Sequence, residues 1–432
     1  MQIAYFSPFN PQRSGISDFS EELVTSLKEY AHLTLFTSNE NGCSERLNQE
    51  FEVYRIKDYQ TRQVRDQFDI AVFHVGNNYD FHGEIVETFL RYGGILELHD
   101  IAMHHFLAEA TLKKGKNDEY IAAMDYCHGI KGKQRAKDFL YGGKTAPWAK
   151  ESLKYPVNRY LIDKAQAVIV HSDFAYEIVR GICLEVPLIK IGLHSPEIMQ
   201  CDIARKTKAR EKLDIKFDKL VMCVFGYASP EKRIVQILEA VSLYAKKYGD
   251  FHLYIVGKIA GIDIGHEIDR LELEDKVTVT GFVDLGDFNL YMLACDIAFN
   301  LRYPTQGESS ASLAKLLGWG KTVFVTNIGT FREIPDHVVV KIEYGQHEVQ
   351  QILENILKVR DCLDVYGTNA YKYALQYNNI KDNAKKYFQF FQRIIERHTI
   401  KAGFQDTVLD EIFRFGLNER NYVDHICKKM DY

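Results

Sequence analysis

Short apolar runs alternate with helical segments along most of this 432-residue chain. The runs are four to eight residues long and rich in β-branched and aromatic residues. The segments between them repeat apolar positions at helical spacing, as Ile16, Phe19, Leu23 and Leu27 do. Alternation of this kind predicts parallel sheets covered by helices on both faces. Because two such series follow one another, the sequence predicts an α/β protein with two doubly wound, Rossmann-like domains.

The predicted strands lie in runs that end in Gly, Ser, Asp or His at several places. In the first series the runs are QIAYFSPF, HLTLFTS, DIAVFHV, GGILELHD and AVIVHS. In the second series they are LVMCVFGY, HLYIVG, KVTVTGFV, DIAFNLR, TVFVTN and VVVKIE. A polar, charged stretch near residues 195–218 interrupts the alternation, so we place the domains at 1–200 and 201–380, followed by C-terminal helices over 381–432.

An insertion near residues 107–156 contains no good strand pattern and predicts helices. It is locally basic, with the segments LKKGKNDEY and IKGKQRAKDFLYGGK, although the chain as a whole is acidic. One interpretation is a solvated helical face. The other is a docking surface for an acidic or membrane-bound acceptor.

The overall charge and the cysteines exclude several classes of protein. A net charge of -5 argues against general binding of nucleic acids. The N-terminus MQIAYFSPFNPQ lacks the pattern of a signal peptide, and no apolar run approaches the roughly 18 residues of a membrane span. The eight cysteines form no CxxC pair, which disfavours zinc knuckles and a disulfide framework. These features predict a reduced, cytoplasmic protein.

Candidate ligand-binding residues of the first domain follow its predicted strands, because open parallel sheets bind ligands at the carboxyl ends of their strands. Gly15 lies at a turn into a helix, where backbone N–H groups favour a phosphate, although a simple turn glycine is the alternative. His99 and Asp100 end a later strand, and His104 and His105 follow. Their spacing does not match a zinc motif, so we predict no metal. We expect one of His104 and His105 to be a hydrogen-bonded histidine of the core. His99 could form a hydrogen bond with a sugar hydroxyl.

Candidate residues of the second domain lie at two helix starts. Lys232 and Arg233 precede a predicted helix, where the dipole disfavours cations unless an anion is bound, so they indicate a pyrophosphate site or else a pair of exposed surface cations. Glu308 follows the strand DIAFNLR and precedes Ser309 and Ser310. It either caps the first helical turn through the dipole or accepts hydrogen bonds from sugar hydroxyls.

These motifs resemble those of the retaining glycosyltransferases of family 4, which have the GT-B fold, and the resemblance covers nearly the whole chain. SPFNPQRSGISDFSEELV is similar to the family's amino-terminal glycine loop, LELHD to its donor-sugar strand, and VFGYASPEKRIVQILEA to its diphosphate segment. The run from TGFVDLGDFNL to YPTQGESS is similar to its base loop and acidic helix start. The chain resembles in particular the subset with a PTxGExS pattern.

The resemblance implies two domains that face a central cleft, with C-terminal helices crossing back to the first domain. The first domain would bind the acceptor and the second the nucleotide sugar, without a metal or other cofactor. His99, Lys232 and Glu308 would be the catalytic residues, holding the donor sugar and stabilising the departing diphosphate. Further donor contacts would come from Gly15, Arg233, Arg302, Gly307, Ser309 and Ser310, and the base would lie near Gly281 and Phe282.

Three positions depart from the family pattern. Tyr227 replaces an Arg, Arg233 replaces a Gly, and Leu316 replaces a second Glu that holds the ribose. These changes leave the nucleotide base open. The expected activity is transfer of a sugar to a glycan, lipid-linked or protein-linked acceptor in surface polysaccharide or glycoconjugate synthesis, with loose attachment to the inner membrane face as an option. The alternatives are an inactive GT-B partner subunit and a sugar-nucleotide 2-epimerase.

Overall fold

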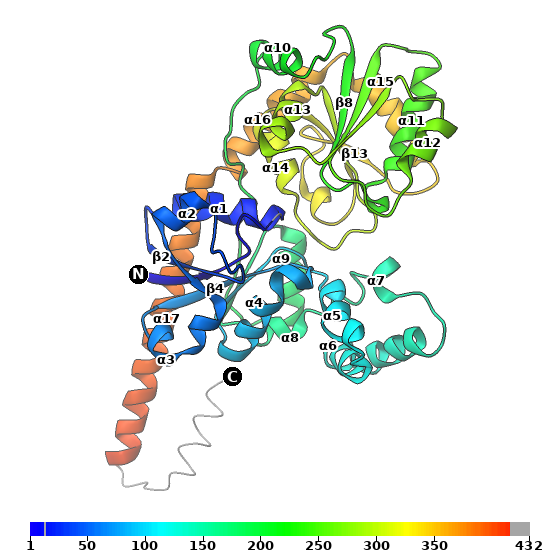
Figure 1. Cartoon of the computed structure of the whole chain (residues 1–432). Coiled ribbons are helices and arrows are strands. Elements are labelled where there is room, and N and C mark those ends of the chain that lie inside the picture. Colours follow the sequence, from blue (N-terminus) through cyan, green and yellow to red (C-terminus); the bar gives the residue numbers. More distant parts are fainter. Residues whose placement is uncertain (13, 415–432) are drawn as a thin grey trace.

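A computed structural model describes residues 1–12 and 14–414, with side chains up to residue 397, and shows two α/β domains (Figure 1). The first domain contains a parallel sheet of seven strands in the order β3-β2-β1-β4-β5-β6-β7. The strands are β1 (Gln2–Phe6), β2 (His32–Thr37), β3 (Glu52–Arg55), β4 (Ile70–Val75), β5 (Ile95–Leu98), β6 (Ala167–Val170) and β7 (Leu188–Lys190).

Helices cover both faces of this sheet because successive strand residues point to opposite sides. Ile3 and Tyr5 of β1 belong to one apolar core, while Ala4 and Phe6 belong to another. The helices are α1 (Gly15–Leu27), α2 (Glu45–Glu50), η1 (Ile56–Gln60), α3 (Arg62–Arg65), α4 (Tyr79–Tyr92), α5 (His104–Thr111), η2 (Leu112–Lys114), α6 (Asn117–Leu140), α7 (Pro147–Lys150), α8 (Arg159–Ile162) and α9 (Asp173–Ile182).

The second domain contains six parallel strands in the order β10-β9-β8-β11-β12-β13. Its strands are β8 (Leu220–Phe225), β9 (Phe251–Val256), β10 (Val277–Gly281), β11 (Ile297–Asn300), β12 (Thr322–Thr326) and β13 (Val340–Ile342). Its helices are α10 (Ile203–Lys212), η3 (Pro230–Lys232), α11 (Ile234–Ala245), α12 (Ile264–Arg270), α13 (Leu285–Ala294), α14 (Ala311–Gly318), η4 (Gly329–Glu333), α15 (Glu348–Val359) and α16 (Leu363–Tyr377). The structure is therefore the predicted pair of Rossmann-like domains.

Two strands of the first sheet were missed by the sequence pattern. β3 has the sequence EVYR and β7 has the sequence LIK, and both lie at edges of the sheet. An edge strand pairs on one side only and can be short and partly exposed. Neither segment has the apolar run of a buried strand. These residues form strands because they pair with the neighbouring strand, which a local sequence pattern does not reveal.

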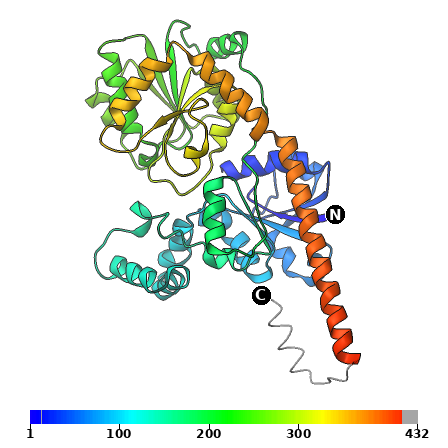
Figure 2. The ribbon, with the colours of Figure 1, turned by 180° about the vertical axis from the view of Figure 1, so that it is seen from behind.

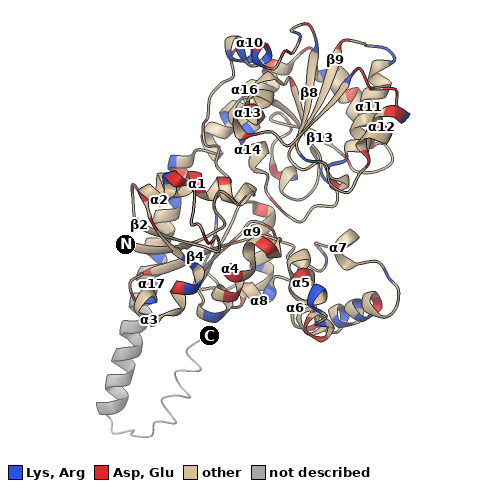
Figure 3. Ribbon diagram, in the orientation of Figure 1, with Lys and Arg blue, Asp and Glu red and all other residues tan. Residues whose placement is uncertain are grey.

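The basic insertion forms most of α5, then η2, α6 and α7, and it lies beside the first domain between β5 and β6 (Figure 1). A small apolar core of its own contains Tyr120, Met124 and Tyr155. Lys and Arg gather along α6 in Figure 3. Gly129 interrupts α6 with a positive φ of 62°. The insertion is thus a distinct helical lobe with a basic surface.

The last helix, α17 (Ile380–Arg414), returns to the first domain and packs along α1 (Figure 2). Its residues Tyr387 and Phe391 complete the same core as Ile3 and Leu23. At the crossing, the backbone N–H of Ser195 in the interdomain connection donates to the carbonyl of Asn378 over 2.8 Å. Residues 415–432 of the predicted C-terminal helices lie outside the described part of the chain.

Candidate active site

The strand order reverses once in each sheet, between β1 and β4 in the first domain and between β8 and β11 in the second. Ligands of doubly wound folds bind at such a switch point, beyond the carboxyl ends of the strands. In the second domain these ends lead into the loops 226–233 and 301–310. The loops contain Lys232 and Glu308, so two residues 76 positions apart are brought to one switch point.

Three donors hold the carboxylate of Glu308 in the loop between β11 and α14. Arg302 Nη1 donates to Oε1 over 2.9 Å. Thr305 Oγ1 and the backbone N–H of Gln306 donate to Oε2 over 2.8 and 2.7 Å. A carboxylate offers about four acceptor positions. These contacts orient Glu308 and leave room for a further donor, such as a hydroxyl.

Ser310, and not Glu308, caps helix α14. Ser310 Oγ accepts from the backbone N–H of Leu313 over 3.3 Å and donates to Asn300 Oδ1 over 3.1 Å. The expectation that Glu308 caps the first turn is wrong, because the helix begins at Ala311 and the carboxylate is engaged within the preceding loop. Glu308 therefore has no capping role that would explain its position.

Lys232 is largely buried at the end of the short turn η3, and its Nζ donates to the carbonyl of Phe225. Burial, and then repulsion from the nearby Arg302, lower the pKa of Lys232 to about 7. An anion placed beside both cations would relieve this repulsion. The arrangement fits a site for a charged group such as a diphosphate.

Arg233 has a different environment from Lys232. It lies in the left-handed region with φ of 60°. Its guanidinium makes a two-pronged ion pair with Glu348, in which Nε to Oε1 is 3.0 Å and Nη2 to Oε2 is 2.6 Å. Glu348 is buried, so the charge of Arg233 is already balanced within the second domain. Neither residue of the Lys232–Arg233 pair is a fully exposed surface cation.

The loop of Glu308 touches the carboxyl edge of the first sheet. The backbone N–H of Ala102 donates to the carbonyl of Gln306 over 2.9 Å, and Ser152 Oγ donates to the carbonyl of Thr305 over 3.1 Å. Gly307 packs so closely that an added Cβ would lie 2.9 Å from Ile101 Cβ. The predicted donor-binding residue Gly307 is therefore buried in a contact between the domains.

His99 and Asp100 directly follow β5, the first-domain strand that faces this loop. Burial raises the pKa of Asp100 to about 6. Across the domain boundary, Glu308 raises this pKa further and Arg302 lowers it. Burial, followed by the nearby His171 and His74, holds the pKa of His99 well below its usual value. His99 is thus a neutral hydrogen-bonding group, as its proposed contact with a sugar hydroxyl requires.

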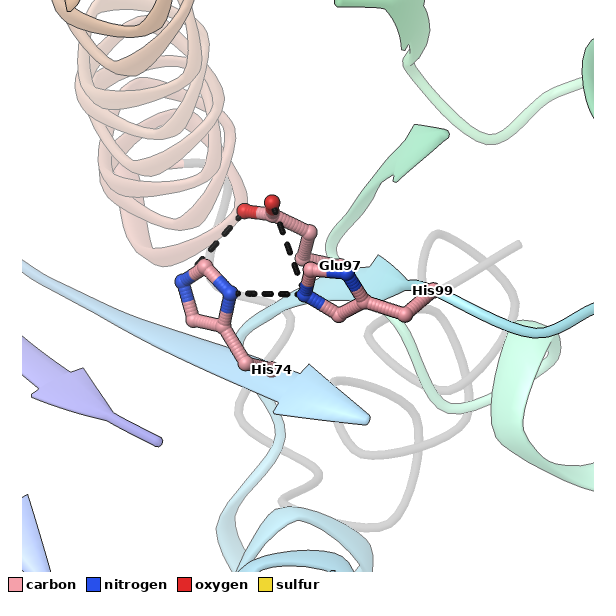
Figure 4. Close-up of side chains that lie close together, drawn as sticks. All are labelled: His74, Glu97 and His99. Atoms are coloured by element: carbon pink, nitrogen blue, oxygen red, sulfur yellow. Dashed lines mark hydrogen bonds and ion pairs between the residues drawn. The ribbon is translucent and has the colours of Figure 1, made fainter. Parts of the chain in front are cut away.

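The surroundings of His99 contain residues that sequence reasoning missed. His74 Nδ1 lies 3.0 Å from His99 Nε2, and the carboxylate of Glu97 contacts both rings (Figure 4). Burial raises the pKa of Glu97 to about 8, although a hydrogen bond from Tyr387 opposes the shift. The sequence could have pointed to these residues, because each is a polar residue inside an apolar run: His74 in DIAVFHV and Glu97 in ILEL.

The other predicted residues lie at several positions around the two sheet edges. Gly15 is exposed at the N-terminus of α1, with open space where a side chain would be. Gly281 ends β10, and Phe282 beside it is 60% exposed. Ser309 and Ser310 line a cavity between the domains together with His171, Lys190 and Tyr377.

His104 is a buried core histidine. Its Nε2 pairs with the hydroxyl of Tyr120 at 2.8 Å, and its Nδ1 lies 3.0 Å from the carbonyl of Tyr155. This confirms the expectation that one of His104 and His105 is a hydrogen-bonded core residue.

Among the described residues, no helix has the length and apolar character to span a membrane.

The second domain matches a known family. Residues 205–373 match the family model for glycosyl transferases group 1. The match supports the transferase activity that the sequence predicts, and it includes both switch-point loops of the second domain. No curated protein sequence matches the chain.

Solved structures share the whole two-domain architecture. Sucrose-phosphate synthase from Thermosynechococcus elongatus has a TM-score of 0.65 at 13% identity, covering 92% of this chain and 100% of that chain. HepE of Anabaena in complex with UDP-glucose has a TM-score of 0.62 at 14% identity, covering 92% and 99%. WaaG, a glycosyltransferase involved in lipopolysaccharide biosynthesis, has a TM-score of 0.59 at 13% identity, covering 90% and 99%. The chain has the GT-B fold.

Proposed function

We propose that this protein is a retaining glycosyltransferase of the family 4 type, which transfers a sugar from a nucleotide sugar to a glycan, lipid-linked or protein-linked acceptor. One observation carries the proposal. Lys232, Arg302 and Glu308 meet at the switch point of the second sheet, and their loop faces His99 and Asp100 of the first. The group 1 match and the UDP-glucose bound by HepE support the same class of donor.

The departing diphosphate is the group that needs charge stabilisation in this reaction. Lys232 lies where that charge develops, Arg302 beside it is partly balanced by its ion pair with Glu308, and the N-terminus of α1 at Gly15 adds backbone N–H groups from the first domain. Arg233 contributes less than the sequence suggested, because Glu348 balances its charge. Fixed donors of this kind cost no reorganisation when the bond breaks.

The donor sugar lies between Glu308 and His99 in this proposal. Glu308 is oriented by its three donors and accepts from a sugar hydroxyl, while Ser309 and Ser310 bring small side chains close to the diphosphate. The ring of His99 holds the sugar from the first domain. Contacts on both sides would fix the orientation of the donor sugar. The acceptor could then attack the same face of the sugar from which the diphosphate leaves.

The nucleotide base is assigned to the region of Gly281 and Phe282. Leu316 is 1% exposed within the core of the second domain, so helix α14 offers no acidic contact to a ribose at that position. The ribose would therefore be held from elsewhere, and the identity of the base is open. We place the protein in the cytoplasm, with the basic insertion as its contact to an acceptor at the inner face of the membrane.

A panel of nucleotides tests the proposal directly. Thermal shifts would be measured with UDP, GDP, dTDP, ADP and CMP and with their common sugar conjugates. Binding at about 100 times the dissociation constant adds about 2.7 kcal/mol to stability, so one base should stand out. Glu308→Gln should keep much of the response to the bare nucleotide and lose the added response to its sugar conjugate. A flat response to every nucleotide would contradict the proposal and favour an inactive partner subunit.

A further inference from the structure

Three side chains with metal-binding atoms lie on one face of the first sheet. His74 of β4 and Glu97 of β5 are register partners on neighbouring strands. His99 follows two residues after Glu97, and side chains two apart in a strand point to the same side. The topology of the sheet therefore brings His74, Glu97 and His99 together, although no local motif links them (Figure 4).

The three side chains are close enough to share a single ion, although the shortest contacts of His74 use its two different ring nitrogens. His74 Nδ1 lies 3.0 Å from His99 Nε2, His74 Nε2 lies 3.4 Å from Glu97 Oε2, and His99 Nε2 lies 3.8 Å from Glu97 Oε1. Bonds of about 2.0–2.1 Å to a tetrahedral zinc ion place neighbouring ligand atoms about 3.3–3.5 Å apart. One ligand atom from each residue lies within 4.8 Å of the other two. Small rotations of the rings would complete the geometry.

Several polar atoms of the cluster are buried without a hydrogen-bond partner in the described part of the chain. They are His74 Nε2, Glu97 Oε2 and His171 Nε2, and the side chains of His74 and Glu97 are fully buried. A polar atom left unpaired in the interior costs about 1–3 kcal/mol, so each such atom calls for an explanation. A bound cation could engage His74 Nε2 and Glu97 Oε2.

The neighbours of the cluster are arranged as supports for ligands. His171 Nδ1 is 2.9 Å from the carbonyl of Ile191, which makes Nδ1 the protonated nitrogen and directs the lone pair of Nε2 toward Glu97, 3.5 Å away. The hydroxyl of Tyr387 donates to Glu97 Oε1 over 2.6 Å. Outer contacts of this kind orient metal ligands in proteins. His171 therefore supports Glu97 from outside the three-residue cluster.

We propose that His74, Glu97 and His99 bind one first-row transition-metal ion such as Zn²⁺. Imidazoles and a carboxylate favour such an ion, whereas Mg²⁺ and Ca²⁺ prefer oxygen ligands throughout. The side chains of His74 and Glu97 are fully buried and that of His99 is 8% exposed, so the site lies inside the first domain. Through Tyr387, it joins the returning helix α17 to the first sheet.

This inference goes beyond the proposed transfer reaction and is independent of it. The metal would occupy Nε2 of His99, and the contact with a donor sugar would use the other ring nitrogen. A protein that binds no metal could therefore still show the thermal shifts with nucleotides that test the proposed function. The two proposals can fail independently.

The test measures metal directly. Protein prepared without a polyhistidine tag would be analysed for metal content by mass spectrometry, and metal-free protein would be titrated with Zn²⁺ and with Co²⁺, whose visible bands report nitrogen and oxygen ligands. We expect one ion per chain, a higher melting temperature with metal, and tetrahedral Co²⁺ bands. A native protein that retains no metal and gives no such bands would overturn the proposal.

Variants locate the site. Glu97→Gln keeps the shape of the side chain, and we expect it and His74→Asn to weaken metal binding by more than the roughly 10–100-fold effect of losing an outer contact. His252→Asn changes a histidine of the second domain and should bind metal as the native protein does. Circular dichroism would show that each variant is folded. If Glu97→Gln is folded and binds metal with unchanged affinity, the ion lies elsewhere and the proposal fails.

Discussion

The two sheets have the same plan, yet they place different chemistry at their facing edges. The edge of the first sheet contains the buried, neutral imidazoles of His74 and His99, whose pKa values are lowered by burial. The edge of the second contains the cations Lys232 and Arg302 beside Glu308. A charged edge suits a diphosphate, and a neutral edge suits hydroxyl groups. The comparison teaches that one architecture can present two kinds of surface, and under the proposed function these would divide the recognition of a nucleotide sugar between them.

Replacing the partly buried cation Lys232 of the second edge should have the largest effect. Lys232→Ala removes the group that we propose faces the departing diphosphate, and we expect sugar transfer to fall about 10²–10³-fold, as for loss of one fixed donor to a developing charge. Transfer rates with the donor identified by thermal shift would measure this. Lys246→Ala, an exposed lysine that caps α11, is the matched control. Unchanged transfer in Lys232→Ala would contradict the assignment.

Disturbing the contact between the edges should have the next largest effect. Gly307 has a φ of +73°, and an added Cβ would lie 2.9 Å from Ile101 Cβ. We expect Gly307→Ala to destabilise the protein by about 1–3 kcal/mol, through backbone strain and this clash. Gly115→Ala is the control, because its φ is +72° and its surroundings are open. Equal losses of melting temperature in the two variants would mean that the contact contributes nothing.

The pH dependence of nucleotide binding should distinguish Lys232 from its neighbour. In the free protein the pKa of Lys232 is lowered to about 7 by burial and by Arg302, and a bound diphosphate would raise it. The protonated form binds better, so affinity is full below pH 7 and falls as pH rises above it, by at most about tenfold per pH unit. Calorimetry in buffers of different ionisation enthalpy should show proton uptake on binding.

Lys232→Arg provides the control for this pH dependence, because a guanidinium stays charged throughout the range. We expect this variant to bind the nucleotide with little change between pH 7 and pH 9. If the native protein also shows no change, then Lys232 does not face the diphosphate.

The smallest effect should come from the surface of the insertion. Lys131 and Lys137 are exposed on α6. If this lobe docks on an anionic membrane, each charge reversal to Glu should weaken sedimentation with vesicles rich in anionic lipid, since a basic residue near such a surface contributes about 1 kcal/mol. Lys216→Glu in the second domain is the control. Absence of vesicle binding by the native protein would favour the solvated-face interpretation.

The sequence predicted the architecture because buried parallel strands leave strong local patterns. It missed β3 and β7, whose short edge segments depend on a neighbouring strand. It placed Lys232 and Glu308 at the carboxyl ends of strands, which follows from the alternation of elements. It also left open a capping role for Glu308, whereas α14 begins at Ala311 and is capped by Ser310.

Pairings between distant residues lay beyond local patterns. The ion pair of Arg233 with Glu348 joins residues 115 positions apart, and the contact of Tyr387 with Glu97 joins residues 290 apart. The pairing of His74 with Glu97 follows from strand order, which the alternation of elements did not specify. Such contacts required the tertiary structure.

The return of α17 has a consequence for synthesis on the ribosome. Tyr387, Phe390, Phe391 and Ile394 belong to the core that also contains β1. Roughly 200 residues separate the end of β7 from this segment, and at about 5–20 residues per second they take roughly 10–40 s to synthesise. The first domain leaves the ribosome first, yet its core is completed last. One face of its sheet stays without α17 until the second domain has been synthesised.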